Sequence, residues 1–500
     1  MSNHLSNETS LYLKDYINSK VHWYPYGDQA FQRAKEEKKP IFLSIGYSGS
    51  HWCHIMKEES FEQEEIAQRL NKHFIAIKVD KDERTDLDKY YKQVYKLMNG
   101  QACSSPISLF LTEDRAPFYA AAYIGTTPRG NVLDFRTLLD VVIQKYHHDK
   151  KTMVQKGEEV LHYLQPTQGS IQATRLNMNV LKTIKLHAQN LFDATHGGFG
   201  TTPKFLQLSL LDLLLEAYQH DHDPDLLSMV TFSLDKMIQG EIHDHDNGGF
   251  FHYANQASWS FPRQEKMLYD NAYMVNILLK TNAITSNPIY QKVAFKTLDY
   301  LIKNFSHHDL FGSNAFAYQG EWKVDPKIVT SFNAMMITAL LDAGKIERHY
   351  HNLAIKRLDQ LLQQLQGTQL YHTSTIPAFL DDYAYLAYAL LHAHNLTQEP
   401  TYLAHAEELA NQAIGIFYTH GRWKFSQTIP NLYDDIHDPL YPSAIATMLI
   451  LLQDLSWKIE SDYTPIVFKT LEFHSYNLMR QPLSSPKMST ALLRHLKKML

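Results

Sequence analysis

At 500 residues with 44% hydrophobic side chains, the chain is long enough for two or more domains with sizeable cores. Its 48 basic and 53 acidic side chains are mixed along the sequence and leave a net charge of -5, which argues against a nucleic-acid partner. The first twenty residues lack the apolar core of a signal peptide, and apolar runs such as 444–452 are too short to span a membrane. We therefore expect a cytoplasmic protein with no membrane partner.

Short β-rich runs alternate with helical stretches in the segment from Pro40 to Gly125. The β-rich runs are residues 40–47, 74–80, 107–113 and 121–125. Helical stretches separate the first three runs, which gives a β-α-β-α-β-β order. Parallel strands need such helical crossovers, and the last two runs can pair through a turn at EDRAP. We expect a thioredoxin-like α/β domain over residues 1–165.

From about Asn177 onward the strand signal vanishes and amphipathic helical stretches follow one another. We expect helices near 179–193, 206–219, 225–239, 267–284, 288–305, 330–345, 347–366, 380–395, 399–417, 441–456, 463–480 and 489–500. Glycine-containing loops recur between alternate helices, at Gly198, Gly249, Gly312, Gly367 and Gly421.

A recurring helix, loop, helix unit indicates a repeat architecture. Six such hairpins over residues 178–500 predict an all-α (α/α)6 toroid, and residues 166–177 are then the linker to the first domain. An open helical solenoid would fit the same period. We favour the closed ring because the terminal units lack the polar faces that end caps need.

The stretch SIGYSGSHWCHIM, residues 44–56, follows an apolar run and opens a helix, where a thioredoxin-type fold carries its reactive thiol. Ser50 stands where a Cys-X-X-Cys motif would hold its attacking thiol, so turnover of a disulfide at Ser50 and Cys53 is not expected. Ser50 could instead cap the helix, and Cys53 could be a buried apolar side chain. Cys103 lies three residues before Pro106 and could replace the lost thiol from across the site. We also expect a cis peptide bond before Pro106.

Carboxylates and aromatic rings gather in the predicted loops of the toroid. Glu265, Asp270 and Asp382 are candidate catalytic groups, because paired carboxylates can do general acid and base work on a glycosidic bond. The other candidate cleft residues are Phe199, Phe250, His252, Trp259, Arg263, Tyr269, Asn271, Asn333, Asp381 and Tyr383. The structural alternative is that the carboxylates cap helices, which suits Asp381 and Asp382 just before a helix.

Glu265 and Asp270 belong to one stretch, EKMLYDNA. Five residues correspond to about 140° around a helix, so both can face a cleft only if Glu265 precedes the first turn. We expect Glu265 in the loop and Asp270 in the helix. An inward-pointing Arg263 would pair with Glu265 and keep it ionised, which would make it a poor general acid.

Several long motifs carry a family resemblance. HWCHIMKEESFEQEEIAQRLNKHFIAIKVDKDERTDLD, GGFGTTPKF, EKMLYDNA and DDYAYLA resemble the spermatogenesis-associated protein 20 family, in which a thioredoxin-like domain is fused to a six-hairpin toroid. The resemblance implies a thiol-disulfide type of domain in front and a toroid akin to sugar epimerases and glycosidases behind. It extends along nearly the whole chain.

The chain departs from the family pattern at both implied sites. The family's Cys-His-Trp-Cys-His reads Ser50-His51-Trp52-Cys53-His54, which leaves Trp52 and His54 beside a single thiol. In the toroid, Pro-His-Phe-Glu becomes Pro262-Arg263-Gln264-Glu265. These losses predict a degenerate member that binds a sugar, another small molecule or a protein partner rather than turning a substrate over.

Two catalytic alternatives remain open. One is a carbohydrate-processing enzyme that uses the toroid, and the other is a redox protein that uses Cys53 with Cys103. We assign no cofactor and no metal, because the 27 histidines are scattered along the sequence.

Overall fold

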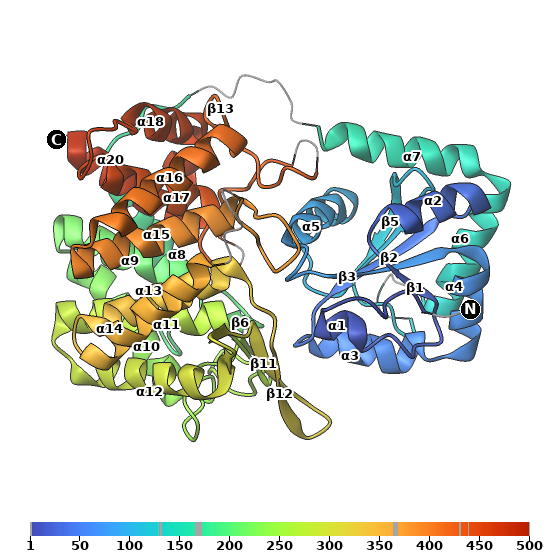
Figure 1. Ribbon diagram of the computed structural model, residues 1–500, viewed down its shortest axis with the longest axis horizontal. Helices are drawn as coiled ribbons and strands as arrows, with labels where there is room; N and C mark the ends of the chain where they lie inside the picture. The colour runs from blue at the N-terminus through green and yellow to red at the C-terminus, as the bar shows by residue number, and fades with distance from the viewer. Residues whose placement is uncertain are drawn as a thin grey trace. The chain divides into compact units, whose positions relative to one another are not determined.

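The computed structural model describes residues 3–128, 130, 133–165, 173–363, 369–429, 432–438 and 440–499 (Figure 1). The chain divides into two compact units, Met1–Gln168 and Gly169–Leu500. Residues 166–172 of the expected linker and the expected loop at Gly367 lie outside the described residues.

The first unit is built on a five-stranded mixed sheet with the strand order β1-β3-β2-β4-β5. Its strands are β1 (Trp23–Pro25), β2 (Ile41–Gly46), β3 (Ile75–Asp80), β4 (Ile107–Leu111) and β5 (Pro117–Ala121). Strands β1 and β2 run parallel to β3, whereas β4 is antiparallel to β2 and β5 to β4. This is the thioredoxin-like α/β fold that the sequence predicts.

Two details of the sheet differ from the expectation. The sequence pattern did not reveal β1, because three residues are too short to show alternation. Strand β5 also starts four residues before the expected run. The turn that precedes it is tight, since Arg115 has a φ of 72° and the N–H of Thr112 donates to the carbonyl of Ala116.

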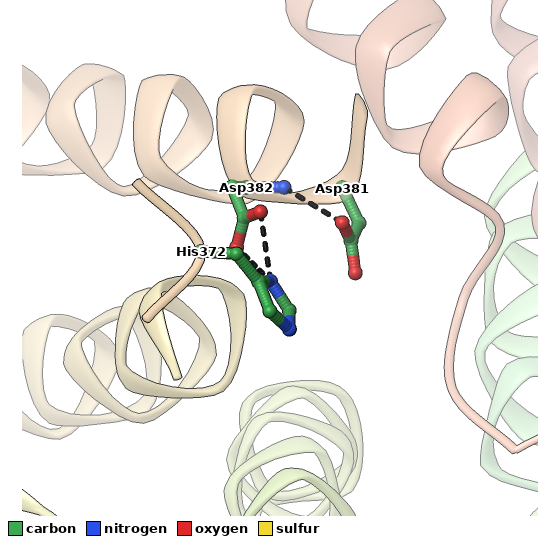
Figure 2. Close-up of side chains that lie close together, drawn as sticks. All are labelled: His372, Asp381 and Asp382. Atoms are coloured by element: carbon green, nitrogen blue, oxygen red, sulfur yellow. Dashed lines mark hydrogen bonds and ion pairs between the residues drawn. The ribbon is translucent and has the colours of Figure 1, made fainter. Parts of the chain in front are cut away.

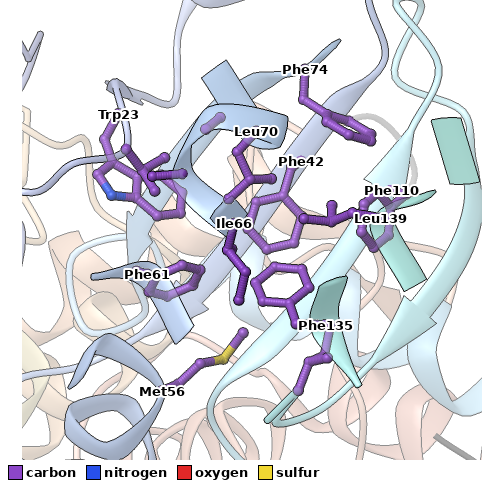
Figure 3. Close-up of a cluster of buried hydrophobic side chains, with 14 of the residues drawn as sticks. Trp23, Phe42, Met56, Phe61, Ile66, Leu70, Phe74, Phe110, Phe135 and Leu139 are labelled. Carbon is purple, nitrogen blue, oxygen red and sulfur yellow. The ribbon is translucent and has the colours of Figure 1, made fainter. Parts of the chain in front are cut away.

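Helices cover both faces of this sheet. They are α1 (Leu11–Lys14), α2 (Asp28–Glu37), α3 (His51–Met56), a π-helical turn (Lys57–Phe61), α4 (Glu64–His73), α5 (Thr85–Asn99), α6 (Phe135–His148) and α7 (Lys150–Tyr163). The rings of Trp23, Phe42, Phe61, Phe110 and Phe135 meet in the core between the sheet and α3, α4 and α6 (Figure 3). This packing fixes the start of α3 over the end of β2.

In the described part of the second unit, six inner helices form a closed ring. They are α9 (Leu208–Asp221), α11 (Leu268–Thr285), α13 (Thr330–Gly344), α15 (Leu380–Thr397), α17 (Ala444–Leu455) and α20 (Pro486–Met499). Each packs against the next, and α20 packs back against α9. The closed toroid is therefore confirmed, and the open solenoid is excluded.

Outer helices pack around this ring. They are α8 (Val180–Leu191), α10 (Pro224–Gln239), α12 (Pro288–Phe305), α14 (Arg348–Leu362), α16 (Pro400–Phe417) and α18 (Thr464–Phe473). The expected helix at 463–480 is divided at His474 into α18 and a short α19 (Ser475–Arg480), and a 3-10 turn (Pro482–Ser484) precedes α20.

Short strands lie in the loops of the second unit, where none was expected. They are β6 (Lys204–Phe205), β7 (Tyr253–Ala254), β8 (Glu265–Met267), β9 (Ser306–His307), β10 (Leu310–Phe311), β11 (Asn314–Tyr318), β12 (Glu321–Asp325), β13 (Tyr418–Thr419) and β14 (Arg422–Trp423). Most are only two or three residues long, so alternation could not reveal them. The three-stranded sheet β12-β11-β8 leads directly into α11.

Two of the glycine loops share one construction. The carboxylate of Asp193 binds the buried ammonium of Lys204 at 2.7 Å, and that of Asp244 binds Lys266 at 2.7 Å. In each loop the aspartate also accepts backbone N–H bonds from residues two and three positions later. Gly198 must be glycine, because a Cβ there would lie 2.5 Å from the ring of Trp259. A lysine from a following strand, Lys204 in β6 or Lys266 in β8, thus pairs with the aspartate of each loop.

A buried ionic cluster ties the end of the ring to its beginning. Asp212 on α9 accepts from Lys487 on α20 at 2.7 Å, from Lys280 on α11 at 2.8 Å and from the hydroxyl of Tyr273 at 2.9 Å. Burial alone would raise the pKa of Asp212, but the two ammonium groups outweigh it and hold the pKa below its usual value. The carboxylate therefore stays ionised and joins three neighbouring helices.

We predict that Asp212→Asn lowers the free energy of unfolding of the toroid by roughly 3 kcal/mol, because Lys487 and Lys280 both lose the buried carboxylate between them, and among the described residues only Lys280 keeps a second partner, Glu216 at 3.6 Å. Urea denaturation of the full chain, followed by circular dichroism, measures the change. The control is Asp225→Asn, since Asp225 pairs with Lys185 on the surface and should contribute less than about 1 kcal/mol. Equal effects of the two substitutions would contradict the role of Asp212 in ring closure.

Candidate functional site

The start of α3 holds the thiol region of the first unit. The hydroxyl of Ser50 accepts from the backbone N–H of Cys53 at 3.3 Å, so Ser50 caps the helix as the structural alternative predicted. Half-buried Trp52 lies against the ring of Tyr123, and His54 contacts the carbonyl of Ser48 at 2.7 Å. These contacts describe a well-ordered helix start that lacks an attacking cysteine.

Neither cysteine is set up as a thiolate. Cys53 is 2% exposed, and burial raises its pKa although Ser50 and Lys78 act in the opposite direction. Burial raises the pKa of half-buried Cys103 to about 12. Both cysteines are free, so the alternative in which Cys53 pairs with Cys103 is not formed in this structure. The expected cis bond before Pro106 is present.

Beneath the thiol lies a fully buried lysine that the sequence patterns did not single out. The ammonium of Lys78 on β3 donates to the hydroxyl of Ser44 at 3.1 Å. It lies 3.9 Å from the ring centre of Tyr16, 4.5 Å from that of Phe61 and 4.8 Å from that of Trp23. Burial lowers the pKa of Lys78 to about 7. The signal in the sequence was a lysine inside the mostly apolar strand IAIKVD.

In the second unit, a histidine and an aspartate meet at the start of α11. Asp270 is the third residue of this helix, and one carboxylate oxygen lies 2.6 Å from Nδ1 of His252. The backbone N–H of His252 donates to the carbonyl of Glu265 at 2.9 Å, which fixes the approach of the imidazole. Both side chains are buried.

A second histidine and aspartate meet at the start of α15 (Figure 2). Asp382 is the third residue of this helix, and its oxygens lie 2.8 and 3.0 Å from Nδ1 of His372. The same carboxylate accepts from the backbone N–H of Phe379 at 2.8 Å and of Ser331 at 3.0 Å. Asp382 therefore caps its helix, as the structural alternative predicted, and also orients His372.

His372, Asp381 and Asp382 form a group that could hold a metal ion. One potential ligand atom of each lies within 4.8 Å of the others. The carboxylate of Asp382, however, already accepts two backbone N–H bonds as well as the imidazole. Asp381 accepts from the backbone N–H of Asp382 at 3.0 Å. The bonds made by Asp382 fit a positioning carboxylate better than a metal ligand.

Aromatic rings connect the two histidine–aspartate pairs. The ring of Tyr269 lies 6.4 Å from that of His252 and 5.0 Å from those of Phe332 and Tyr441. The hydroxyl of Tyr441 in turn donates to Asp381 at 3.4 Å, beside the second pair. The two pairs therefore belong to one contiguous cluster, with one pair at the start of α11, the other at the start of α15, and Phe332 on α13 between them.

The hydrogen bonds determine how the imidazoles are used. An ionised carboxylate only accepts, so Nδ1 carries the proton in both His252 and His372. Nε2 is then the nitrogen that can take up a proton. A buried aspartate behind each ring also stabilises the imidazolium that forms when it does so.

The other predicted residues have different surroundings. Glu265 is 4% exposed and lies in β8 rather than in a loop. Strand β8 leads directly into α11, the helix that contains Asp270. Arg263 and Glu265 both influence Tyr253: burial raises the pKa of this phenol, Glu265 raises it further and Arg263 lowers it. The expected order, with Glu265 before the helix and Asp270 inside it, is correct.

Two predicted cleft asparagines have a clear structural use. The side-chain oxygen of Asn271 accepts from the N–H of Phe250 at 2.6 Å, and that of Asn333 accepts from the N–H of Phe311 at 2.9 Å. Each amide also donates back to the carbonyl of the same residue. Phe199, Phe250, Trp259 and Tyr383 are likewise buried. Contacts of these residues with a ligand stay a prediction.

His372 and Tyr441 were not among the predicted site residues. The sequence contains a signal for His372, since FFHY at 250–253 and LYHT at 370–373 both place a histidine after apolar or aromatic residues. Each histidine is followed within twenty residues by an aspartate at the third position of an inner helix. Tyr441 has no comparable pattern.

Comparisons with known proteins agree with this architecture. The family Thioredox_DsbH, described as "Protein of unknown function, DUF255", matches residues 2–165. An uncharacterized protein of Caenorhabditis elegans is 39% identical over 277 residues, covering 55% of this chain and 38% of the relative. Spermatogenesis-associated protein 20 of Rattus norvegicus is 34% identical over 318 residues, covering 61% of this chain and 40% of that protein.

The chain is thus similar to spermatogenesis-associated protein 20 over 61% of its length. It spans about 40% of the length of the curated relatives that it matches. Cellobiose 2-epimerase from Bacillus thermoamylovorans superposes with a TM-score of 0.52 at 12% identity, covering 64% of this chain and 97% of that one. D-mannose isomerase superposes with a TM-score of 0.51 at 14% identity, covering 65% of this chain and 98% of the isomerase. These likenesses show the toroid fold.

Among the described helices, none has the length and apolarity to cross a bilayer.

We predict that Lys78→Met removes a pH dependence of stability from the first unit. Burial lowers the pKa of Lys78 from 10.5 to about 7, so between these pH values the unfolded chain holds a proton that the folded protein has released. Stability of the wild type therefore rises with pH over this window, by up to about 5 kcal/mol, and the variant is more stable at pH 7. Amide hydrogen exchange in β2 and β3 measures the free energy of opening.

Lys35→Met is the matched control, because the side chain of Lys35 is 61% exposed on α2. It should leave the pH dependence as in the wild type. The same slope for the wild type and Lys78→Met between pH 7 and 10 would show that Lys78 is charged in the folded protein.

Proposed function

We propose that the toroid binds a reducing sugar and moves protons on it, as a sugar isomerase or epimerase does. The observation that carries this proposal is the pair of buried His–Asp couples, His252 with Asp270 and His372 with Asp382. Histidines that can act as general acid and base are what proton transfer at carbon requires.

The use of the carboxylates favours this reaction over glycosidic cleavage. A glycosidase of the usual type needs two carboxyl groups that face the scissile bond. Here Asp270 and Asp382 are each committed to an imidazole, and Asp382 is also committed to two backbone N–H groups. Glu265 lies in a strand and is 4% exposed. The two structural neighbours with the higher TM-scores, named as an epimerase and an isomerase of sugars, are consistent with this choice.

The roles of the residues follow from their protonation. Nε2 of one histidine takes the proton from the carbon next to the sugar carbonyl, and the electron pair moves into an enediolate. The second histidine, as an imidazolium, gives a proton to that intermediate. Asp270 and Asp382 hold the two rings in the required tautomer, and the half-buried ring of Tyr441, which packs on buried Tyr269, offers a face for the sugar.

For the first unit we propose a structural or recognition role without disulfide turnover. Ser50 caps α3 and Cys53 is a buried thiol with a raised pKa, so the unit has the fold of a thioredoxin without its attacking group. The prediction of a family member without catalytic activity is thus kept for the first unit. For the toroid we propose catalysis instead.

The test is product analysis on reducing sugars, using mannose, glucose, fructose and cellobiose with the full chain. Wild type should interconvert at least one of them. His252→Gln and His372→Gln should each lower the rate by about 100-fold or more, since each removes a general acid or base. The control is His405→Gln, because His405 is exposed on the outer helix α16 and should have no effect.

Three results would contradict the proposal. One is conversion that survives loss of either histidine, and another is hydrolysis of cellobiose without isomerisation. The third is the absence of any conversion with sugars that bind, which would return the toroid to a binding role.

A further inference from the structure

The first turn of α13 contacts the second His–Asp pair from the neighbouring inner helix. The backbone N–H of Thr330 donates to the carbonyl of His372 at 2.9 Å, and the hydroxyl of Thr330 donates to the carbonyl of Tyr371 at 2.7 Å. The next N–H, that of Ser331, donates to the carboxylate of Asp382 at 3.0 Å. One helical turn therefore holds both the backbone of the histidine and the side chain of the aspartate.

The loop that carries His372 is also closed by bonds of its own. The N–H of His372 donates to the carbonyl of Ile376 at 2.7 Å, and the N–H of Ala378 donates to the carbonyl of Leu370 at 3.0 Å. These two bonds shape the loop but join it only to itself. The bonds from Thr330 attach its backbone to the inner ring, because Thr330 is the first residue of α13.

The hydroxyl of Thr330 makes its bond away from bulk water, since this residue is 1% exposed. Valine has nearly the same shape without a hydroxyl, and would leave the carbonyl of Tyr371 without this donor. The imidazole of His372 lies 2.8 Å from Asp382, a distance that depends on where the histidine backbone is held. Displacement of a reacting group by about 1 Å costs up to roughly 100-fold in rate.

The first His–Asp pair is held in another way. The N–H of His252 donates at 2.9 Å to a carbonyl of β8, and the following strand β7 pairs with β6. The first turn of α13 reaches this pair through rings only: that of Phe332 lies 5.0 Å from Tyr269, which lies 6.4 Å from His252. Loss of the hydroxyl of Thr330 should therefore displace the second histidine and leave the first in place.

We propose that Thr330 is a positioning residue for the proton transfer: its hydroxyl fixes the backbone of His372, and so the direction in which Nε2 of that imidazole faces the sugar. The inference rests on the proposed function, because it assigns a geometric task to the support of one of the two histidines named there. Thr330 takes no part in making or breaking a bond. It acts through the carbonyls of Tyr371 and His372.

The first experiment measures kcat and KM of the full chain on whichever of mannose, glucose, fructose and cellobiose the wild type converts fastest. Thr330→Val should lower kcat about tenfold and change KM less than about twofold, because the groups that contact the sugar are retained. Thr330→Ser restores the hydroxyl and should recover most of the rate. The matched control is Thr338→Val, since Thr338 is a buried threonine of the same helix whose hydroxyl donates to Ala334 at 2.9 Å. It should leave kcat within about twofold of the wild type.

The second experiment does not depend on activity. Proton–nitrogen NMR of the full chain labelled with ¹⁵N-histidine detects the proton on Nδ1 of each imidazole that is bonded to an aspartate, and the spectra of His252→Gln and His372→Gln assign the two resonances. In Thr330→Val the resonance of His372 should shift or be lost through faster exchange with water. The resonance of His252 should stay, whereas a general loss of structure would change both.

The outcomes separate the inference from the proposed function. An unchanged His372 resonance in Thr330→Val would overturn the inference alone, whether or not the rate falls, if the wild type isomerises a sugar. Equal changes in both resonances, or a loss of rate that Thr330→Ser does not recover, would also overturn it, since the effect would then be structural. Failure of the wild type to isomerise any sugar would overturn the proposed function, and the inference with it.

Discussion

Closure of the inner ring is the constraint on which the toroid depends. Helix α20 must return to α9, and the buried carboxylate of Asp212 joins these two helices to α11 through Lys487 and Lys280. Ring closure fixes the positions of all the inner-helix starts at once. Side chains from α11, α13 and α15 then meet without any one loop having to carry the whole site, because each helix contributes a residue from its first turn.

The first turns of α11, α13 and α15 hold the preceding loops and orient the two histidines. Asn271 and Asn333 hold the preceding loops through paired backbone hydrogen bonds, and the neighbouring carboxylates orient histidines. The buried ammonium groups of Lys204 and Lys266 pair with the aspartates inside the glycine loops. The amides, carboxylates and ammonium groups named here are therefore bound by the protein itself, and the two imidazoles are the groups to which we assign proton transfer.

The sequence predicted the long helices and strands better than it predicted which side chains contact one another. Strand and helix periodicity gave the thioredoxin-like sheet and the inner and outer helices, because these elements are long and bury a regular face. Strands β6 and β7 escaped notice because they are two residues long. His372 and Lys78 escaped notice because their partners, Asp382 and Ser44, become neighbours only through the fold. Asp270 and Asp382 were singled out for acid chemistry, whereas their hydrogen bonds suit the orientation of a histidine.

Proton transfer between the sugar and solvent is the most direct measure of the central claim, that the two His–Asp pairs move protons on a bound sugar. Incubation of the full chain with mannose, glucose or cellobiose in D₂O should place deuterium on the carbon next to the sugar carbonyl, as read by proton NMR. Asp270→Asn should slow this exchange by about 100-fold, because His252 loses its tautomer and orientation. Exchange at the wild-type rate in Asp270→Asn, or conversion of a sugar without any uptake of deuterium by the wild type, would contradict the account.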